Sequence, residues 1–170
     1  NGSRKRLATA MGVSENNVVE EFQRRLGDPQ PIVDVEHDQA PVQKIVLEDD
    51  QADLTQLPFY VQHRLDGSPY ISSGIDYSMD PETGTTNVGC RRLSLRNARE
   101  AGTNVTAPSD LKRIYTGCST RGERLPINFA VGSHPIDYMA AGMRIPADEV
   151  TLVSTLRGEP FPMVKGITNN

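Results

Sequence analysis

The sequence has 170 residues, of which 36% are hydrophobic and 24% charged, with a formal net charge of -4. That length is enough to bury one ordinary core but is short for two full domains. The acidic balance argues against a nucleic-acid partner, and neither an apolar run long enough for a membrane span nor a secretory signal is visible. We therefore expect a cytoplasmic protein whose two cysteines are reduced.

Two short helices are predicted at the start of the chain, one over Arg4–Met11 and one after Ser14, which is suited to cap it. The second carries apolar residues at a spacing of four: Val18, Phe22 and Leu26. Short β-rich runs follow at 32–35 and 42–47, so the stretch before residue 58 is typical of a boundary zone. We expect a partial helical and β segment with a linker over 1–57, and a β-rich domain over 58–170 that is incomplete at its C-terminal end.

The second part begins with a predicted hairpin, in which extended runs at 70–79 and 85–95 flank a turn rich in Pro and Gly. A helix follows Pro108, with Ser109 or Asp110 as its cap, and ends near Gly122. We then expect a buried strand at 125–131, a short helix at 136–143, a helix or strand at 149–156 and a strand at 163–168. No closing element follows, so we expect a fragment or a split polypeptide.

The hairpin's second run changes its apolar phase partway along. Val88 and Cys90 occupy even positions, whereas Leu93 and Leu95 occupy odd ones. Because side chains alternate between the faces of a strand, this shift predicts a bulge near Arg91 and Arg92 or burial on both faces. Gly89 in the middle of the run favours close approach by a ligand or another backbone.

The adjacent arginines Arg91 and Arg92 carry planar guanidinium groups that suit a phosphate or a carboxylate. The alternative is structural, with Arg91 solvated and Arg92 in a salt bridge. The pattern of residues leaves both open.

The motif Asn87-Val88-Gly89-Cys90-Arg91-Arg92 resembles a strand of the UbiD family of decarboxylases, which use prenylated flavin mononucleotide (prenylated FMN). In that strand an Asn binds a metal and an Arg five positions later reaches the substrate carboxylate. Further blocks agree in order and spacing across nearly the whole chain: Gly67-Ser68-Pro69-Tyr70-Ile71, Asp80-Pro81-Glu82-Thr83-Gly84, Arg121-Gly122-Glu123-Arg124-Leu125-Pro126, and Leu156-Arg157-Gly158-Glu159-Pro160 leading to Val164-Lys165.

The resemblance implies an α+β fold: a split β-barrel flavin-binding domain with flanking helices, preceded by part of an N-terminal α/β segment. It also implies prenylated FMN, a divalent ion (Mn²⁺ or Mg²⁺) and a potassium ion as cofactors.

The family binds its metal through an Asn, a His and a Glu, which correspond here to Asn87, an unmatched position and Glu149. Counting from the flanking motifs places the missing histidine at Asp110 or at Ser109. We favour Asp110, because a carboxylate is a good ligand for manganese or magnesium. The competing interpretation of Asp110 is a helix N-cap, and one Asp could serve both roles.

The resemblance further implies a set of flavin contacts. The segment Ala140-Ala141-Gly142-Met143 is similar to a family loop that lies against the flavin and offers carbonyls to potassium, although helix packing explains its small residues equally well. The expected cofactor-binding residues are Asn87, Gly89, Cys90, Arg91, Arg92, Ser109, Ala141, Gly142 and Met143.

Decarboxylation of an unsaturated or aromatic acid leaves charge on carbon that side chains cannot delocalise, so a cofactor must act as electron sink. Arg92 is the implied catalytic residue, and the family's two catalytic glutamates fall beyond the chain, so we expect this chain alone to be inactive. Expected partners are a small carboxylic acid and either further copies or a chain that supplies the C-terminal part. The alternatives are a flavin- and metal-binding or assembly subunit, and a split-barrel reductase that uses ordinary FMN.

Overall fold

The computed structural model describes residues 2–168, which contain both helices and strands. The α-helices are α1 (Arg4–Met11), α2 (Val18–Leu26), α3 (Asp110–Thr120), α4 (Pro135–Ala141) and α5 (Glu149–Arg157). The strands are β1 (Ile32–Asp34), β2 (Tyr70–Met79), β3 (Thr86–Leu95), β4 (Ala101–Thr103), β5 (Ile127–Val131) and β6 (Phe161–Met163). Between β1 and β2 the chain makes short 3₁₀ turns, and Tyr60 forms an isolated β-bridge with Tyr70.

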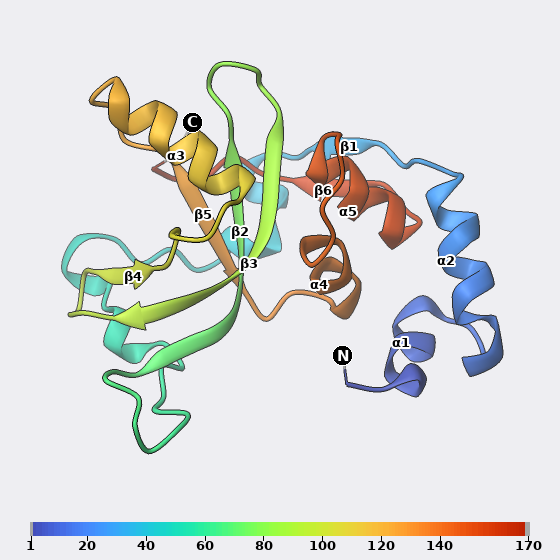
Figure 1. The fold of residues 1–170 in the computed structure, drawn as a ribbon, viewed down its shortest axis with the longest axis horizontal. Coiled ribbons are helices and arrows are strands. Elements are labelled where there is room, and N and C mark those ends of the chain that lie inside the picture. Colours follow the sequence, from blue (N-terminus) through green and yellow to red (C-terminus); the bar gives the residue numbers. More distant parts are fainter. Residues whose placement is uncertain (1, 169–170) are drawn as a thin grey trace.

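The strands form an antiparallel sheet in the order β4-β3-β2-β5 and a separate parallel pair of β1 with β6. Figure 1 shows the long β2–β3 hairpin at the centre, with the helices α1, α2, α4 and α5 gathered to one side of it. The fold is therefore mixed α and β. Within residues 2–168 the four-stranded sheet is open, and the split barrel stays an expectation from the resemblance.

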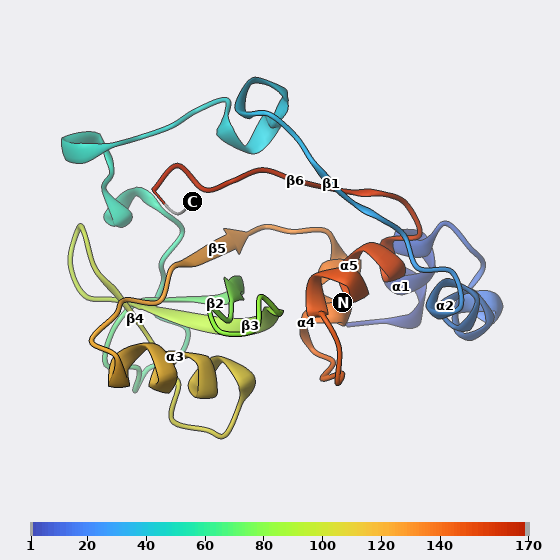
Figure 2. The same ribbon diagram turned by 90° about the horizontal axis from the view of Figure 1, so that it is seen from above.

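Two groups of helices cover the sheet from different sides. Helix α3 lies along one face (Figure 2), and its apolar residues Leu111, Ile114 and Cys118 are buried. On the other side, Ile75 and Val88 of the hairpin join one hydrophobic cluster with residues from α1, α4 and α5: Ala8, Met11, Ile136, Ala140, Val150, Val153 and Leu156. This core crosses the predicted division at residue 57, and that division stays a prediction.

The predicted helices over Arg4–Met11 and after Ser14 are confirmed, as are the hairpin and the helix after Pro108. The region over 149–156, left open between helix and strand, is the helix α5. Over residues 2–168, no helix has the length and apolar character needed to cross a membrane.

Three strand predictions need correction. Residues 42–47 form no strand, and Val42 and Ile45 are 78% and 79% exposed, because nothing in the described chain pairs with this segment. The strand predicted at 163–168 lies earlier, at Phe161–Met163, where it pairs with β1. The strand predicted at 125–131 begins at Ile127 and is only half-buried, because it pairs with β2 alone at the edge of the sheet.

The change of phase in β3 reflects burial on both faces, and the irregularity of the sheet lies in the partner strand β2. Between Ile71 and Gly74 the register of β2 slips relative to β3, so Ser72 and Ser73 together oppose the single residue Arg92. The extra residue thus belongs to β2, and β3 itself stays regular. Burial also changes face along β3, because Val88 is buried in the cluster with α4 and α5, and Leu93 is buried five residues later.

Candidate functional site

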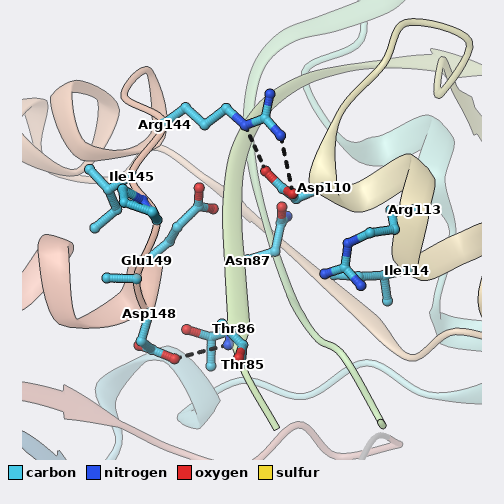
Figure 3. Close-up of a pocket in the computed structure, with 12 residues that line it drawn as sticks. Thr85, Thr86, Asn87, Asp110, Arg113, Ile114, Arg144, Ile145, Asp148 and Glu149 are labelled. Atoms are coloured by element: carbon cyan, nitrogen blue, oxygen red, sulfur yellow. Dashed lines mark hydrogen bonds and ion pairs between the residues drawn. The ribbon is translucent and has the colours of Figure 1, made fainter. Parts of the chain in front are cut away.

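A pocket of about 680 Å³ opens where the start of β3, the start of α3 and the segment leading into α5 meet. Figure 3 shows the side chains of Asn87, Asp110 and Glu149 directed toward this space from three different elements. The other lining residues are Thr85, Thr86, Arg113, Ile114, Arg144, Ile145, Pro146, Ala147 and Asp148. The three side chains predicted to bind metal therefore share one pocket.

Two carboxylates fix α5 against the free edge of β3. Asp148 accepts hydrogen bonds from Thr151 N at 3.0 Å, which caps α5, and from Thr86 N at 2.9 Å. Glu149 Oε2 accepts a hydrogen bond from Val88 N at 2.7 Å. These strand N–H groups need partners because β4 pairs only with the far end of β3. The contacts hold the start of α5 beside the pocket.

Glu149 is 8% exposed, so its carboxylate is largely desolvated. Burial raises the pKa of Glu149, and the nearby negative charge of Asp110 raises it further. The hydrogen bond from Val88 and the charge of Arg144 act in the opposite direction. A cation between the two carboxylates would relieve this repulsion.

Asp110 is the first residue of α3, and Ser109 before it is the N-cap. Ser109 Oγ accepts from Lys112 N at 3.2 Å, so the cap is Ser109 and the side chain of Asp110 remains available to the pocket. Asp110 pairs there with Arg144, with 3.0 Å between Oδ2 and Nε. Of the two candidates for the missing histidine, Asp110 lines the pocket and Ser109 does not.

Asn87 is 5% exposed, and its Nδ2 donates to Asp76 Oδ2 at 3.2 Å. Over the described residues, no three His, Cys, Asp or Glu side chains are grouped so that they could hold a metal ion. An ion in this pocket would therefore depend on the Asn87 amide together with Asp110 and Glu149. Two carboxylates and an amide oxygen form the kind of hard-oxygen set that Mn²⁺ or Mg²⁺ prefers.

The two arginines of β3 have surroundings opposite to those in the structural alternative. Arg91 Nε lies 3.5 Å from Asp76 Oδ1, whereas Arg92 is exposed and forms no ion pair within residues 2–168. Asn87 and Arg91 both contact Asp76, so the alternation of β3 turns Arg92 to the opposite face. Arg92 does not line the pocket.

The remaining predicted flavin contacts lie outside the pocket lining. Cys90 is exposed, and Ala141 packs in the hydrophobic cluster. Gly142 ends α4, and Met143 N donates to Ala140 O at 2.9 Å. Packing thus accounts for part of this small-residue segment, and its role toward flavin or potassium stays a prediction.

Comparison with known proteins identifies the family. Residues 33–170 match the family model described as "UbiD: 3-octaprenyl-4-hydroxybenzoate carboxy-lyase Rift-related domain". The chain belongs to the UbiD family. Within it, a phenolic acid decarboxylase of Streptomyces sp. strain D7 is 32% identical over 177 residues, which cover 95% of this chain and 36% of the relative.

Solved structures of UbiD-class enzymes superpose closely on this chain. The enzyme HmfF from Pelotomaculum thermopropionicum in complex with FMN gives a TM-score of 0.88 at 30% identity, covering 99% of this chain and 38% of HmfF. An evolved dimeric form of HmfF in complex with prenylated FMN also gives 0.88, at 29% identity, covering 100% of this chain and 40% of that one. The chain thus spans less than half the length of these UbiD proteins.

Sequence reasoning missed three side chains around the pocket. Asp148 carries no signal of its own in the sequence, and Arg144 carries none because its partner Asp110 is 34 residues away. Asp76 is fully buried in β2, and a charged residue within an otherwise apolar and small-residue strand was the available signal.

Proposed function

We propose that this chain forms the metal and flavin-phosphate part of a UbiD-type enzyme that decarboxylates, or carboxylates, an aromatic, heteroaromatic or α,β-unsaturated acid. The observation that carries the proposal is the convergence of Asn87, Asp110 and Glu149 on one pocket in a UbiD-family chain. We place the enzyme in the cytoplasm and expect its sheet to belong to a split barrel.

In this proposal Asn87, Asp110 and Glu149 hold Mn²⁺ or Mg²⁺ through oxygen atoms. The pocket also suits a phosphate, because α3 and α5 both begin at it and the N-terminal ends of helices carry partial positive charge. Arg113 and Arg144 add two cations to its lining. A flavin phosphate beside the metal would meet these positive charges, which offset the carboxylates of Asp110, Asp148 and Glu149 in the same lining.

Prenylated FMN, when bound, supplies the electron sink that the reaction requires. Val88 packs in the same cluster as Ala140 and Ala141, and Cys90 and Arg92 continue that face of β3 beyond it. We assign this face, with Ala141, Gly142 and Met143, to the flavin, and we assign carbonyls of the same segment to a potassium ion. Arg92 is exposed without an ion pair in the described chain, so its guanidinium is free to orient a substrate carboxylate.

A second candidate function is a flavin- and metal-binding subunit that pairs with another chain or with further copies of itself. The dimeric form of HmfF, which superposes on this chain, favours that candidate. No observation favours the reductase alternative.

The experiment is to titrate the purified chain with Mn²⁺ and prenylated FMN and then to assay furan-, pyrrole- and cinnamate-type acids. We expect Mn²⁺ to tighten flavin binding, and Glu149→Gln to abolish that effect while the exposed Glu123→Gln retains it. Turnover would favour the enzyme, and binding without turnover would favour the assembly subunit. Flavin binding that is indifferent to Mn²⁺ and to Glu149→Gln would overturn both.

A further inference from the structure

Asp76 lies in the middle of β2 with its side chain fully buried. Burial is the main cause that raises the pKa of Asp76 to about 6, and the charge of Arg91 opposes it. A buried carboxylate costs folding free energy compared with an apolar side chain of similar size. Asp76 contacts a residue that lines the pocket, so its polar contacts can give it a role that an apolar side chain could not fill.

The two oxygens of Asp76 have different partners. Oδ2 accepts from Asn87 Nδ2 at 3.2 Å. Oδ1 has no hydrogen-bond donor within the described part of the chain, and its nearest cation is Arg91 Nε at 3.5 Å. The hydrogen bond with Asn87 links Asp76 directly to a residue that lines the pocket.

Gly89 makes room for this carboxylate. Asp76 and Gly89 are opposite each other in the β2–β3 register. A Cβ atom on Gly89 would lie 2.9 Å from Asp76 Oδ1 and 3.2 Å from Arg91 Cζ. The close approach that the sequence predicted at Gly89 is thus made by side chains of the protein itself.

The chemistry of the pair is directional. An ionised carboxylate can only accept hydrogen bonds, whereas the amide of Asn87 has a donor end and an acceptor end. The nitrogen of Asn87 must therefore face Asp76, and the oxygen is left for the pocket. A metal ion binds the oxygen of an amide, so Asn87 can bind a cation in the pocket only in the orientation that turns its oxygen toward the pocket.

We propose that Asp76 is a positioning residue that orients the Asn87 amide so that its oxygen faces the pocket. The proposal rests on the proposed function, because the oxygen matters only if a cation binds there. Asp76 itself does not line the pocket and has no assigned contact with metal or flavin.

The test begins with Asp76→Asn, which keeps the shape of the side chain but can satisfy either orientation of Asn87. Mn²⁺ affinity is measured on the full 170-residue chain from the loss of the free Mn²⁺ signal in electron paramagnetic resonance. We expect affinity to fall about 10- to 100-fold, the range typical for lost outer-shell partners of metal ligands. Thermal unfolding should change little, because a buried charge has been removed.

A double-mutant cycle separates orientation from simple loss of charge. In an Asn87→Asp background the ligand has two equivalent oxygens and needs no orienting partner. We therefore expect Asp76→Asn to weaken Mn²⁺ binding when Asn87 is present but not in the Asn87→Asp background. An equal loss in both backgrounds would overturn the proposal and leave Asp76 as a source of negative charge only.

Orientation is also measurable without metal, by hydrogen exchange of the Asn87 side-chain amide in nuclear magnetic resonance. We expect its protons to exchange more slowly than those of the exposed Asn104, and to lose that protection in Asp76→Ala. Fast exchange in the unmodified chain would overturn the inference even if Mn²⁺ binds. Slow exchange without Mn²⁺ binding would instead overturn the metal site in the proposed function.

Discussion

Adjacent arginines in β3 show how strongly the face of a strand decides a side chain's role. The Arg91 side chain is 21% exposed and is the cation closest to the buried Asp76. Arg92 is exposed and has no carboxylate partner within residues 2–168. One arginine therefore supports the fold, and the other is available to a ligand.

This difference predicts opposite effects of two alanine variants. Arg91→Ala leaves the Asp76 carboxylate buried without its cation, so we expect a loss of about 2 kcal/mol in the free energy of unfolding. Arg92→Ala should change that free energy by less than about 0.5 kcal/mol, as is usual for an unpaired surface residue. Urea denaturation of the two variants measures both values.

If Arg92 binds the substrate carboxylate as proposed, Arg92→Ala in the complete enzyme should abolish turnover while flavin still binds, because the lost contact would be with the substrate and transition state. If Arg91→Ala abolishes turnover and Arg92→Ala does not, the carboxylate-binding role belongs to Arg91. Comparable losses of stability in the two variants would contradict the structural assignment of both residues.

The sequence pattern could not decide which of the two arginines binds a ligand and which is structural, although it indicated that this part of β3 is unusual. The phase change from Val88 to Leu93 predicted a bulge near Arg91 and Arg92 or burial on both faces; β3 is regular and buried on both faces, and the bulge lies in β2, opposite Arg92. Its location in the partner strand, at Ser72 and Ser73, depends on the pairing of two distant segments. A pattern within one strand does not contain that information.

At the scale of elements, the residue before α5 connects this helix to the edge of β3. Asp148 accepts from Thr151 N and Thr86 N, and so it caps α5 and the edge of β3 together. These hydrogen bonds lower the pKa of Asp148, although burial alone would raise it. The position of Glu149 at the pocket depends on this double cap.

We therefore expect Asp148→Ala to destabilise the protein by about 2–3 kcal/mol, because a helix cap and a strand-edge hydrogen bond are lost together. Ser109→Ala is the matched control, since Ser109 caps α3 through the single bond to Lys112 N and should cost about 1 kcal/mol. Chemical denaturation of both variants gives the comparison. Equal losses would mean that the contact with Thr86 contributes nothing.

Local signals predicted the helices better than the strands. Gly12 adopts the left-handed conformation expected after α1, with φ 73°, and Ser109 caps α3 as its residue type indicated. The β-rich composition of 42–47 did not produce a strand, because a strand requires a partner and propensity alone does not supply one. The chemical types of Asn87, Asp110 and Glu149 came from motif resemblance, and only the fold shows that they meet.

For the whole molecule, Arg25 joins parts of the chain that are far apart in sequence. Its guanidinium donates to Met11 O at 2.9 Å, Leu156 O at 2.7 Å and Arg157 O at 2.9 Å, and so it binds the C-terminal ends of α1 and α5. The C-terminal ends of helices carry partial negative charge, which favours a cation there. Leu26, the last residue of the apolar spacing in α2, is 41% exposed, whereas Arg25 is 9% exposed. The arginine can be buried at this position because three carbonyls accept hydrogen bonds from its guanidinium.

Glu21 completes this junction and should make it sensitive to acid. Glu21 Oε1 lies 2.7 Å from Arg25 Nε, and Glu21 Oε2 lies 2.8 Å from Arg24 Nε. Hydrogen bonds from Arg24 and then Arg25 lower the pKa of Glu21 from 4.5 to about 2. Because the pKa is lower in the folded state, the stabilisation is complete above about pH 4.5 and is lost as the pH falls toward 2.

Glu21→Gln should therefore lower the free energy of unfolding at pH 7 by about 1 kcal/mol, a value kept small by solvent screening and by the carbonyl partners that Arg25 retains. The difference in the free energy of unfolding between the variant and the unmodified chain should shrink as the pH is lowered from 4.5 to 2, because protonation neutralises Glu21 in the unmodified chain as well.

Glu20→Gln is the control, since Glu20 is exposed on the same helix and forms no ion pair among the described residues. Urea denaturation at several pH values measures the difference. A constant difference between pH 7 and pH 2.5 would show that the ion pairs of Glu21 do not stabilise the junction.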